Sequence, residues 1–391
     1  MKTSHSPFFV LIALVGGLAI LSSTMSKTPV LPLFAESIGA SPAEIGWIVI
    51  ASTIPGILVS FPAGALSDFL GHRRVLIASL VVFATAPFLY LLVHSAWQLV
   101  AVRFYHGFAT AIFGTVASAA IAERYTADRA ARLSTYSSVT IVGRSIAPFL
   151  GGALISMASF GAVYVACAVS GVLALVAGLF LRDGAPRGKQ KLEMPHFWKS
   201  LVTVLKDRGI MLVSLVEAAQ YLVFGAIEAF LALFAASLGI PAWQIGIILG
   251  VQLVSIVFVK PLMGRVSDRV GRKQVIVPGL LIGAASVVLL PYLASFIGLS
   301  VLSLLFGLGF ATVTSSTSAL VADLTKNGRY GSSMGVLRTV MDVGQSIGPV
   351  LTGWMVTVAG YGKAFALLAA ILASAAILVS AGLRGRVPAA N

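Results

Sequence analysis

The chain has 391 residues, of which 58% are hydrophobic and only 10% are charged, and its mean hydropathy is +0.99. A soluble domain carries about 25% charged residues, so this composition excludes a soluble globular protein and indicates one that lies in lipid. Because a membrane-spanning helix needs about 20 apolar residues, the chain has room for about twelve spans and for no separate catalytic domain.

Apolar runs of spanning length follow one another along the whole chain. We expect each run to be a helix, since a helix in lipid satisfies its own backbone hydrogen bonds. The twelve runs cover residues 8–34, 44–66, 74–93, 97–121, 134–158, 161–181, 209–236, 243–263, 274–293, 296–321, 332–358 and 362–383. The first run also resembles a secretory signal, but its continuation to Phe34 favours an uncleaved helix. The expected fold class is an all-α membrane protein with twelve transmembrane helices.

The Lys and Arg residues predict the orientation of these helices. If both termini are cytoplasmic, 21 basic residues lie in cytoplasmic segments, Lys363 alone lies on the opposite side, and five fall inside spans. This asymmetry predicts a multi-pass protein of the plasma (inner) membrane with both termini cytoplasmic. The formal net charge of +14 is then an orientation signal and a contact with anionic lipid, not an indication of nucleic-acid binding.

The chain divides into two similar halves. "GALSDFLGHRRV" at 64–75 returns as "GRVSDRVGRKQV" at 264–275, and "LFAESIG" at 33–39 returns as "LFAASLG" at 233–239, both 200 residues later. The basic, proline-containing segment 182–208 reads as a cytoplasmic linker. We therefore expect six-helix bundles over 1–181 and 209–391, related by a pseudo-two-fold axis along the membrane normal.

The sequence gives no indication of catalytic or metal chemistry. It holds a single cysteine and five widely separated histidines, without metal-ligand spacing, phosphate-binding loop or Ser/His/Asp arrangement. We expect no enzymatic activity, no metal and no cofactor, so that an ion gradient supplies the energy.

A glycine-rich turn with an acid and two cations occurs in both halves. The pattern Gly-x-Leu-x-Asp-x-x-Gly-x-Arg-Arg reads "GALSDFLGHRR" in the first half. Here the chain resembles the major facilitator superfamily over its whole length, and specifically its branch of proton-coupled antiporters of drugs and small molecules. In that family the turn helps to govern opening between the halves, a role that the resemblance gives to Gly64, Asp68, Gly71, Arg73, Arg74, Asp268, Gly271 and Arg272.

Two further motifs fit the same family. "LVAVRFYHGFATA" at 99–111 is similar to its second motif, in which an intramembrane arginine, here Arg103, is associated with proton coupling. "GRSIAPFLGG" at 143–152 is similar to a motif associated with antiporters, although Ala147 replaces a glycine, and "GQSIGPVLTG" answers it at 344–353. Close helix packing is expected at Gly143, Pro148, Gly151, Gly152, Gly348 and Pro349.

Ionisable residues inside the spans are the strongest evidence outside the motifs, because each costs roughly 2.5–3.5 kcal/mol on insertion scales. The spacing of Glu217, Tyr221, Phe224 and Glu228 puts both carboxylates on one helical face. We expect Lys27, which the 200-residue offset brings next to the position of Glu228, to face that carboxylate across the central axis. Lys260 is expected only to extend toward the cytoplasmic surface.

We expect a secondary transporter that works by alternating access and exports a small organic solute or drug in exchange for protons. The proton-coupling candidates are Glu228, Glu217, Asp342 and Arg103; the substrate-binding candidates are Lys27, Arg144, Gln220, Tyr221, Phe224, Arg338 and Gln345. The expected partners are the solute, protons and membrane lipids, with a monomer as the assembly.

Several alternatives stay open at this point. The protein could be a proton-coupled uptake symporter for an organic anion, a lipid flippase or a membrane receptor without transport activity. The ionisable groups could form static ion pairs, such as one between Arg338 and Asp342, and sodium could replace the proton.

Overall fold

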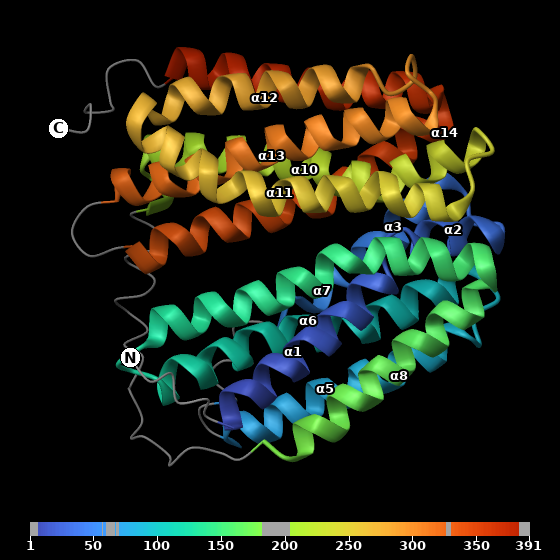
Figure 1. The fold of residues 1–391 in the computed structure, drawn as a ribbon. Helices are drawn as coiled ribbons and strands as arrows, with labels where there is room; N and C mark the ends of the chain where they lie inside the picture. Colours follow the sequence, from blue (N-terminus) through green and yellow to red (C-terminus); the bar gives the residue numbers. More distant parts are fainter. Residues whose placement is uncertain are drawn as a thin grey trace. The chain divides into compact units, whose positions relative to one another are not determined.

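A computed structural model describes residues 7–56, 58–59, 67, 70–181, 204–325 and 330–382. All regular structure within these residues is helical. The helices of the first half are α1 Pro7–Met25, α2 Val30–Ser37, α3 Pro42–Ile50, α5 His72–Tyr90, α6 Ala96–Arg124, α7 Arg129–Met157 and α8 Phe160–Leu179. Those of the second half are α10 Arg208–Ser237, α11 Ala242–Val270, α12 Arg272–Val288, α13 Phe296–Leu324 and α14 Tyr330–Gly382 (Figure 1).

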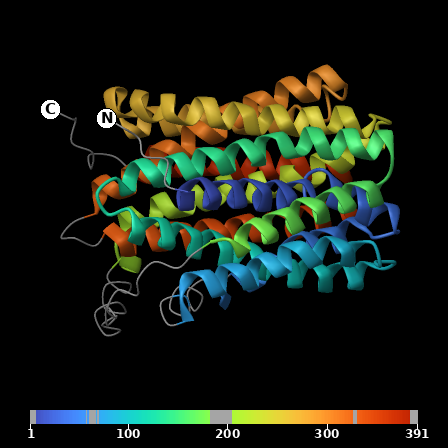
Figure 2. The same cartoon turned by 60° about the horizontal axis from the view of Figure 1, so that its bottom comes forward.

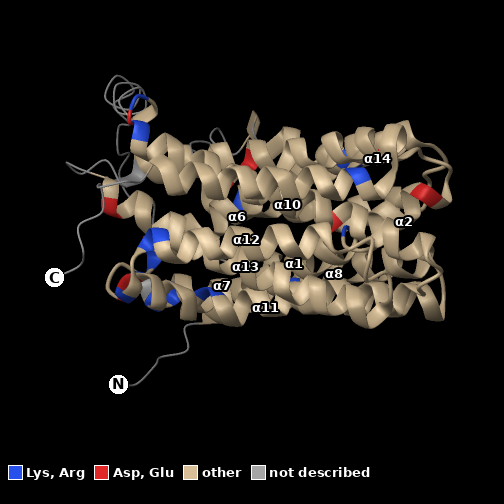
Figure 3. Cartoon of the chain, turned by 90° about the horizontal axis from the view of Figure 1, so that it is seen from above, with Lys and Arg blue, Asp and Glu red and all other residues tan. Residues whose placement is uncertain are grey.

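Nine helical segments of the described chain are long and apolar enough to cross a membrane. Acidic and basic residues lie mainly near the ends of these helices, with long uncharged stretches between them (Figure 3). The run predicted at 44–66 is described as helix mainly over α3, because residues 57 and 60–66 lie outside the described part. The predicted linker also falls largely outside it, at 182–203.

Two predicted spans differ in detail from the structure. The first run is broken, since α1 ends at Met25 and α2 begins at Val30. Pro29 precedes the second helix and has no amide hydrogen to continue the first. The last two runs form the single element α14, which bends at Gly360, where φ is +78°. A positive φ is readily adopted by glycine and marks the turn between the two predicted spans.

Side-chain caps begin many of the helices. The Ser41 hydroxyl accepts from the amide of Glu44 while the Glu44 carboxylate accepts from that of Ser41, a capping box at the start of α3. The hydroxyls of Ser95, Ser159 and Ser295 accept from the amides three residues further on and so cap α6, α8 and α13, without the reciprocal bond of the capping box. These serines satisfy amides that have no partner within their own helix.

The chain forms two compact units. The N-terminal unit holds Met1–Lys189 with Pro241–Gly246, and the C-terminal unit holds Gln190–Ile240 and Ile247–Asn391. In the N-terminal unit α1 packs on α7 and α8, and α5 packs on α6 and α8. In the C-terminal unit α10 packs on α13 and α14, and α12 packs on the same two helices. Within each unit these helices lie side by side in both views (Figures 1 and 2).

Turns at equivalent positions of the two units share one backbone conformation. Gly71 and Gly271 have φ of +90° and +108°, and Gly39 and Gly239 have φ of +83° and +76°. Each pair is separated by the 200 residues that separate the sequence repeats. The repeated glycines therefore serve repeated turns in which a side chain would be strained.

Candidate functional site

The predicted carboxylate Glu217 lies inside the C-terminal unit, on α10. Its side chain is buried, with 2% exposure, and its Oε2 is hydrogen-bonded to the hydroxyl of Thr317 on α13. The same hydroxyl lies 2.9 Å from the carbonyl oxygen of Val313, one turn earlier in α13. Lys260 on α11 is half-buried and acts electrostatically on Glu217, and its extension toward the cytoplasmic surface stays a prediction.

Aromatic rings follow Glu217 along the same face of α10. The Phe224 ring lies 4.5 Å from that of Phe310 on α13, centroid to centroid, and the Tyr221 ring lies 4.9 Å from the same partner. Gln220 lies between Glu217 and these aromatic residues along α10 and is completely buried. The structure thus brings the predicted Glu217, Gln220, Tyr221 and Phe224 together.

The other candidates of the C-terminal unit are placed differently. Glu228 is buried further along α10, at 6% exposure. On α14, Asp342 and Gln345 are half-buried and Arg338 is exposed. No direct ion pair joins Arg338 to Asp342 in the described part of the chain, but Arg338 acts electrostatically on Asp342, so the static pair stays an open alternative.

Close backbone approaches join α10 to α14. Gly344 and Gly348 on α14 lie against the backbone of Ala218 and Leu222 on α10, and Gly225 on α10 lies against Gln345. Gly348 and Pro349 are both buried. The repeated motif in the last third of the chain therefore packs directly on the helix that carries Glu217, as the motif was expected to do.

In the N-terminal unit Arg103 on α6 is the centre of a buried polar cluster. Its guanidinium is 4% exposed and donates to the hydroxyls of Ser52 at 2.5 Å and Tyr90 at 3.3 Å. The Tyr90 hydroxyl also lies 3.2 Å from Nδ1 of His106, and the Tyr90 ring stacks on Tyr164 at 4.5 Å. Arg103 is thus held by neutral partners and does not snorkel to the surface.

The equivalent place in the C-terminal unit is apolar. Counting 200 residues on, Ser303, Leu290 and Phe306 replace Arg103, Tyr90 and His106. These three residues line a narrow gap that has no room for a water molecule, and the Ser303 hydroxyl has no partner among the described residues. The polar cluster is therefore specific to one unit.

The remaining N-terminal candidates are scattered. Lys27 is half-buried between α1 and α2, and Arg144 is exposed on α7. The pairing of Lys27 with Glu228 joins residues of different units and stays a prediction. In α7, Pro148, Gly151 and Gly152 are buried, and Gly143 lies against the backbone of Gly17 on α1.

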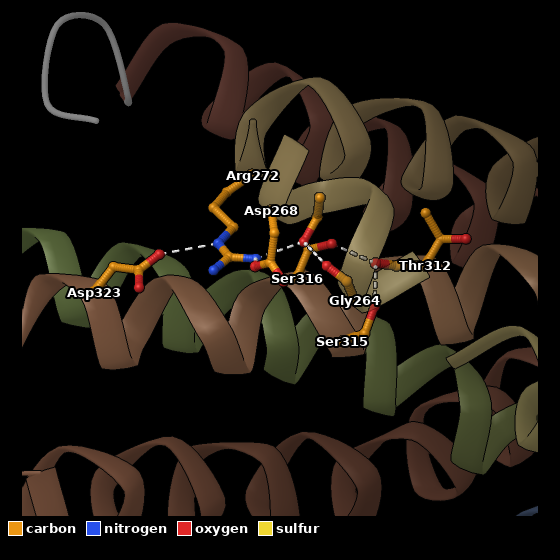
Figure 4. Close-up of polar contacts among 8 residues, drawn as sticks. Gly264, Asp268, Arg272, Thr312, Ser315, Ser316 and Asp323 are labelled. Atoms are coloured by element: carbon orange, nitrogen blue, oxygen red, sulfur yellow. Dashed lines mark hydrogen bonds and ion pairs between the residues drawn. The ribbon is translucent and has the colours of Figure 1, made fainter. Parts of the chain in front are cut away.

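The second copy of the turn motif forms an ionic cluster (Figure 4). The Arg272 side chain at the start of α12 lies between Asp268 on α11 and Asp323 on α13, with its Nε 2.9 Å from the Asp323 carboxylate. It also donates to the Ser267 hydroxyl at 2.7 Å. One guanidinium thereby links three helices.

The first copy makes a parallel set of contacts. His72, at the position equivalent to Arg272, lies 3.5 Å from the carboxylate of Glu123, which is equivalent to Asp323. Arg73 donates to the carbonyls of Leu179 and Leu181 at the end of α8, and Lys273 donates to that of Ser380 near the end of α14. These cations satisfy carbonyls at helix C-termini, where positive charge is favourable. Arg74 is exposed, and Gly64 and Asp68 lie outside the described residues.

The sequence did not identify several residues that make these contacts. Thr317, Phe310, Tyr90, Ser52 and Tyr164 were not predicted. For Thr317 the signal was available in the hydroxyl-rich stretch "TVTSSTS" at 312–318, which is unusual inside an apolar run. The partners of Arg103, Ser52 after α3 and Tyr90 on α5, lie far from it in the sequence and leave no local pattern.

Comparisons with known proteins agree with this architecture. A family model described as Major Facilitator Superfamily matches residues 12–241 and again 213–390. The chain is 23% identical over 340 residues to an uncharacterized MFS-type transporter of Methanocaldococcus jannaschii, covering 85% of this chain and 87% of the relative. It is 24% identical over 369 residues to the multidrug resistance protein MdtG of Escherichia coli, covering 92% and 90%.

A shorter match and a solved structure complete the comparison. The multidrug transporter MdfA of Yersinia pestis is 27% identical over 231 residues, which is 55% of each chain. The crystal structure of the nucleoside transporter NupG (D323A mutant) superposes with a TM-score of 0.83 at 14% identity, over 96% of this chain and 100% of that one. These findings confirm the predicted all-α membrane fold and the predicted family, while the count of twelve spans stays a prediction: the chain belongs to the Major Facilitator Superfamily of membrane transporters.

Proposed function

We propose that the protein exports a small organic solute in exchange for protons, by alternating access, and that Glu217 carries the proton. The observation that supports this most directly is the position of the Thr317 hydroxyl. It lies within hydrogen-bond distance of two oxygens, Oε2 of Glu217 and the carbonyl oxygen of Val313.

A hydroxyl has only one hydrogen to donate. Threonine in a helix commonly gives it to the carbonyl four residues earlier, which is Val313 here. The contact with Glu217 is then a good hydrogen bond only if Glu217 supplies the hydrogen. The geometry therefore favours the protonated carboxylic acid at this position.

Loss of that proton would change what the site needs. A carboxylate in a buried site with a single hydroxyl as partner is strongly disfavoured, unless water or a cation reaches it. The deprotonated form would therefore favour a different arrangement of α10 and α13, in which water or Lys260 comes closer. A group that prefers one conformation when protonated and another when ionised couples a proton gradient to that conformational change.

The direction and the solute are inferred from weaker evidence. The buried Pro148, Gly151 and Gly152 on α7 match the part of the motif that is associated with antiporters. Two relatives carry names that refer to multidrug transport or resistance. Both observations favour export of organic solutes.

Flux measurements in proteoliposomes of known orientation test the proposal. Glu217→Gln should abolish accumulation driven by an imposed pH gradient but leave solute exchange without a gradient intact, since the amide cannot release a proton. Thr317→Val should lower gradient-driven flux roughly 2- to 13-fold, the equivalent of one hydrogen bond of about 0.5–1.5 kcal/mol.

A matched control comes from the same helix. Among the residues that the structure describes, the Thr312 hydroxyl donates only to the carbonyl of Leu308, at 2.7 Å, so Thr312→Val should leave flux unchanged. Undiminished gradient-driven accumulation by the Glu217→Gln variant would refute the assignment of Glu217. Solute movement in the same direction as protons would instead identify an uptake symporter.

A further inference from the structure

Two helices of the C-terminal unit, α10 and α13, carry buried polar atoms on the sides that face each other. We call these sides the stripe; it runs from Glu217 to Phe224 on α10 and from Phe310 to Thr317 on α13. Both amide atoms of Gln220, Oε1 and Nε2, and the hydroxyl of Thr314 make no hydrogen bond within the described part of the chain. Both side chains are completely buried, at 0% exposure. Unpaired buried groups of this kind are uncommon in proteins and call for an explanation.

The register of the two helices puts these orphan groups at the same level. Glu217 contacts Thr317, and Phe224 contacts Phe310. Seven residues forward on α10 correspond to seven residues backward on α13, so the helices are antiparallel in this region. Three residues on from Glu217 is Gln220, and three residues back from Thr317 is Thr314. Both lie on the facing stripes, because positions three, four and seven apart share one face of a helix.

The stripe therefore has three levels. The first holds the Glu217 carboxyl and Thr317, the second holds the Gln220 amide and the Thr314 hydroxyl, and the third holds the rings of Phe224 and Phe310. With a rise of 1.5 Å per residue, the whole stripe extends over roughly 10 Å. That length suits a molecule of two fused rings with a polar edge.

The chemistry of the second level defines what could bind there. A glutamine amide presents a donor beside an acceptor in one plane, and its complement is a ligand edge with an acceptor beside a donor. An amide or lactam group has this pattern. The neighbouring rings of Tyr221, Phe224 and Phe310 favour a flat aromatic body attached to it.

We propose that this stripe recognises neutral, planar aromatic solutes that carry an amide or lactam edge. The Gln220 amide donates one hydrogen bond to that edge and accepts one from it, and Thr314 is an additional hydrogen-bond partner. This inference rests on the proposed function, since it names the class of solute for that transporter. In the conformation described here Gln220 is completely buried, so side chains around it must move before a solute can reach the amide.

Two probes that differ by a single methyl group test the inference. The lactam 2-quinolone has an N–H next to its carbonyl, whereas N-methyl-2-quinolone lacks the donor but keeps the rings and the acceptor. Binding of both to the purified full-length protein in nanodiscs should show a preference for 2-quinolone of roughly 2- to 13-fold, the equivalent of one hydrogen bond.

Variants then assign the preference to its residues. Gln220→Leu should abolish it, and Thr314→Val should lower the affinity for both probes, because either carbonyl can accept from that hydroxyl. Gln252→Leu on α11 is the matched control, since Gln252 is also buried, at 2% exposure, with an unpartnered Oε1, but lies outside the stripe. Its preference should equal that of the unmodified protein. Should Gln220→Leu fail to fold, Gln220→Met offers a side chain of closer shape.

The possible outcomes separate this inference from the proposed function. Equal binding of the two probes by the unmodified protein, or no binding of either, would overturn the inference and indicate that water satisfies Gln220. A preference retained by a folded Gln220 variant would also overturn it. Neither result affects proton-driven flux of other solutes, which tests the function itself. Conversely, a lactam preference without proton-driven flux would support this site and refute proton coupling.

Discussion

The contact between α10 and α14 allows a graded prediction from glycine geometry. A methyl group at Gly348 would lie 2.9 Å from the carbonyl carbon and 3.2 Å from the Cα of Leu222. At Gly344 it would lie 2.8 Å from the carbonyl carbon and 2.9 Å from the Cα of Ala218. These are backbone atoms, so no side chain can rotate away to make room.

The size of the effect follows from these distances. Ordinary contact begins at 3.4 Å, and the carbonyl oxygens of Leu222 and Ala218 lie nearer still, so alanine at either position forces the two helices apart by at least about 0.5 Å. Overpacking of this kind costs about 1–3 kcal/mol. Gly335, also on α14, has nothing within 4 Å, and Gly335→Ala should be neutral or stabilising by about 0.5–1 kcal/mol, because alanine loses less backbone freedom in a helix. Gly143→Ala should fall between them, since its methyl would lie 3.0 Å from the Gly17 carbonyl oxygen.

Thermal unfolding in detergent measures this order. For a unit of roughly 150–250 residues, 1 kcal/mol corresponds to about 2–4 °C, so Gly344→Ala and Gly348→Ala should each lower Tm by about 2–12 °C. Gly335→Ala should leave Tm unchanged or raise it slightly. The reasoning fails if Gly348→Ala and Gly335→Ala have the same Tm.

Two further predictions concern the polar clusters. Tyr90→Phe should destabilise the protein by about 1–3 kcal/mol, because it removes the hydrogen-bond partner of the buried His106 and one of the two partners of Arg103, whose bond to Ser52 remains. Tyr105→Phe, which removes an exposed hydrogen bond to Thr85, should cost less than about 0.5 kcal/mol in the same thermal assay. Arg272→His should cost up to about 1 kcal/mol at pH 8 and less at pH 5.5, since the imidazole pairs with its half-exposed acidic partners only when it is protonated. This contribution is present at low pH and disappears as the pH rises, and a Tm difference from the unmodified protein that is independent of pH would contradict it.

The sequence predicted those features that depend on one helix at a time. The shared face of Glu217, Tyr221 and Phe224 follows from the helical period alone, and the structure confirms it. The partners on α13 could not be predicted, because the register between two helices 100 residues apart is set by packing that no local pattern reports. The break before α2 was missed for another reason: hydropathy is continuous across Pro29, although the missing amide hydrogen marks the position.

The turn motif shows the same limit. Its glycines and cations were recognised from their spacing, but not the acids on other helices that bind them. His72 occupies a variable position of the pattern and was given no role. Its contact with Glu123 is evident only beside that of Arg272 with Asp323.

One helix crossing occurs in both units, although the side chains beside it differ. Gly107 lies against the carbonyl of Ser52 and Gly307 against the carbonyl of Gln252, so the same helix crossing forms in both. Only the first of these two crossings has a guanidinium beside it; beside the second, Ser303 and Phe306 line a narrow gap. The backbone crossing therefore forms with either Arg103 or Ser303 at the equivalent position. The guanidinium of Arg103 is thus not required for the packing of the two helices at this crossing.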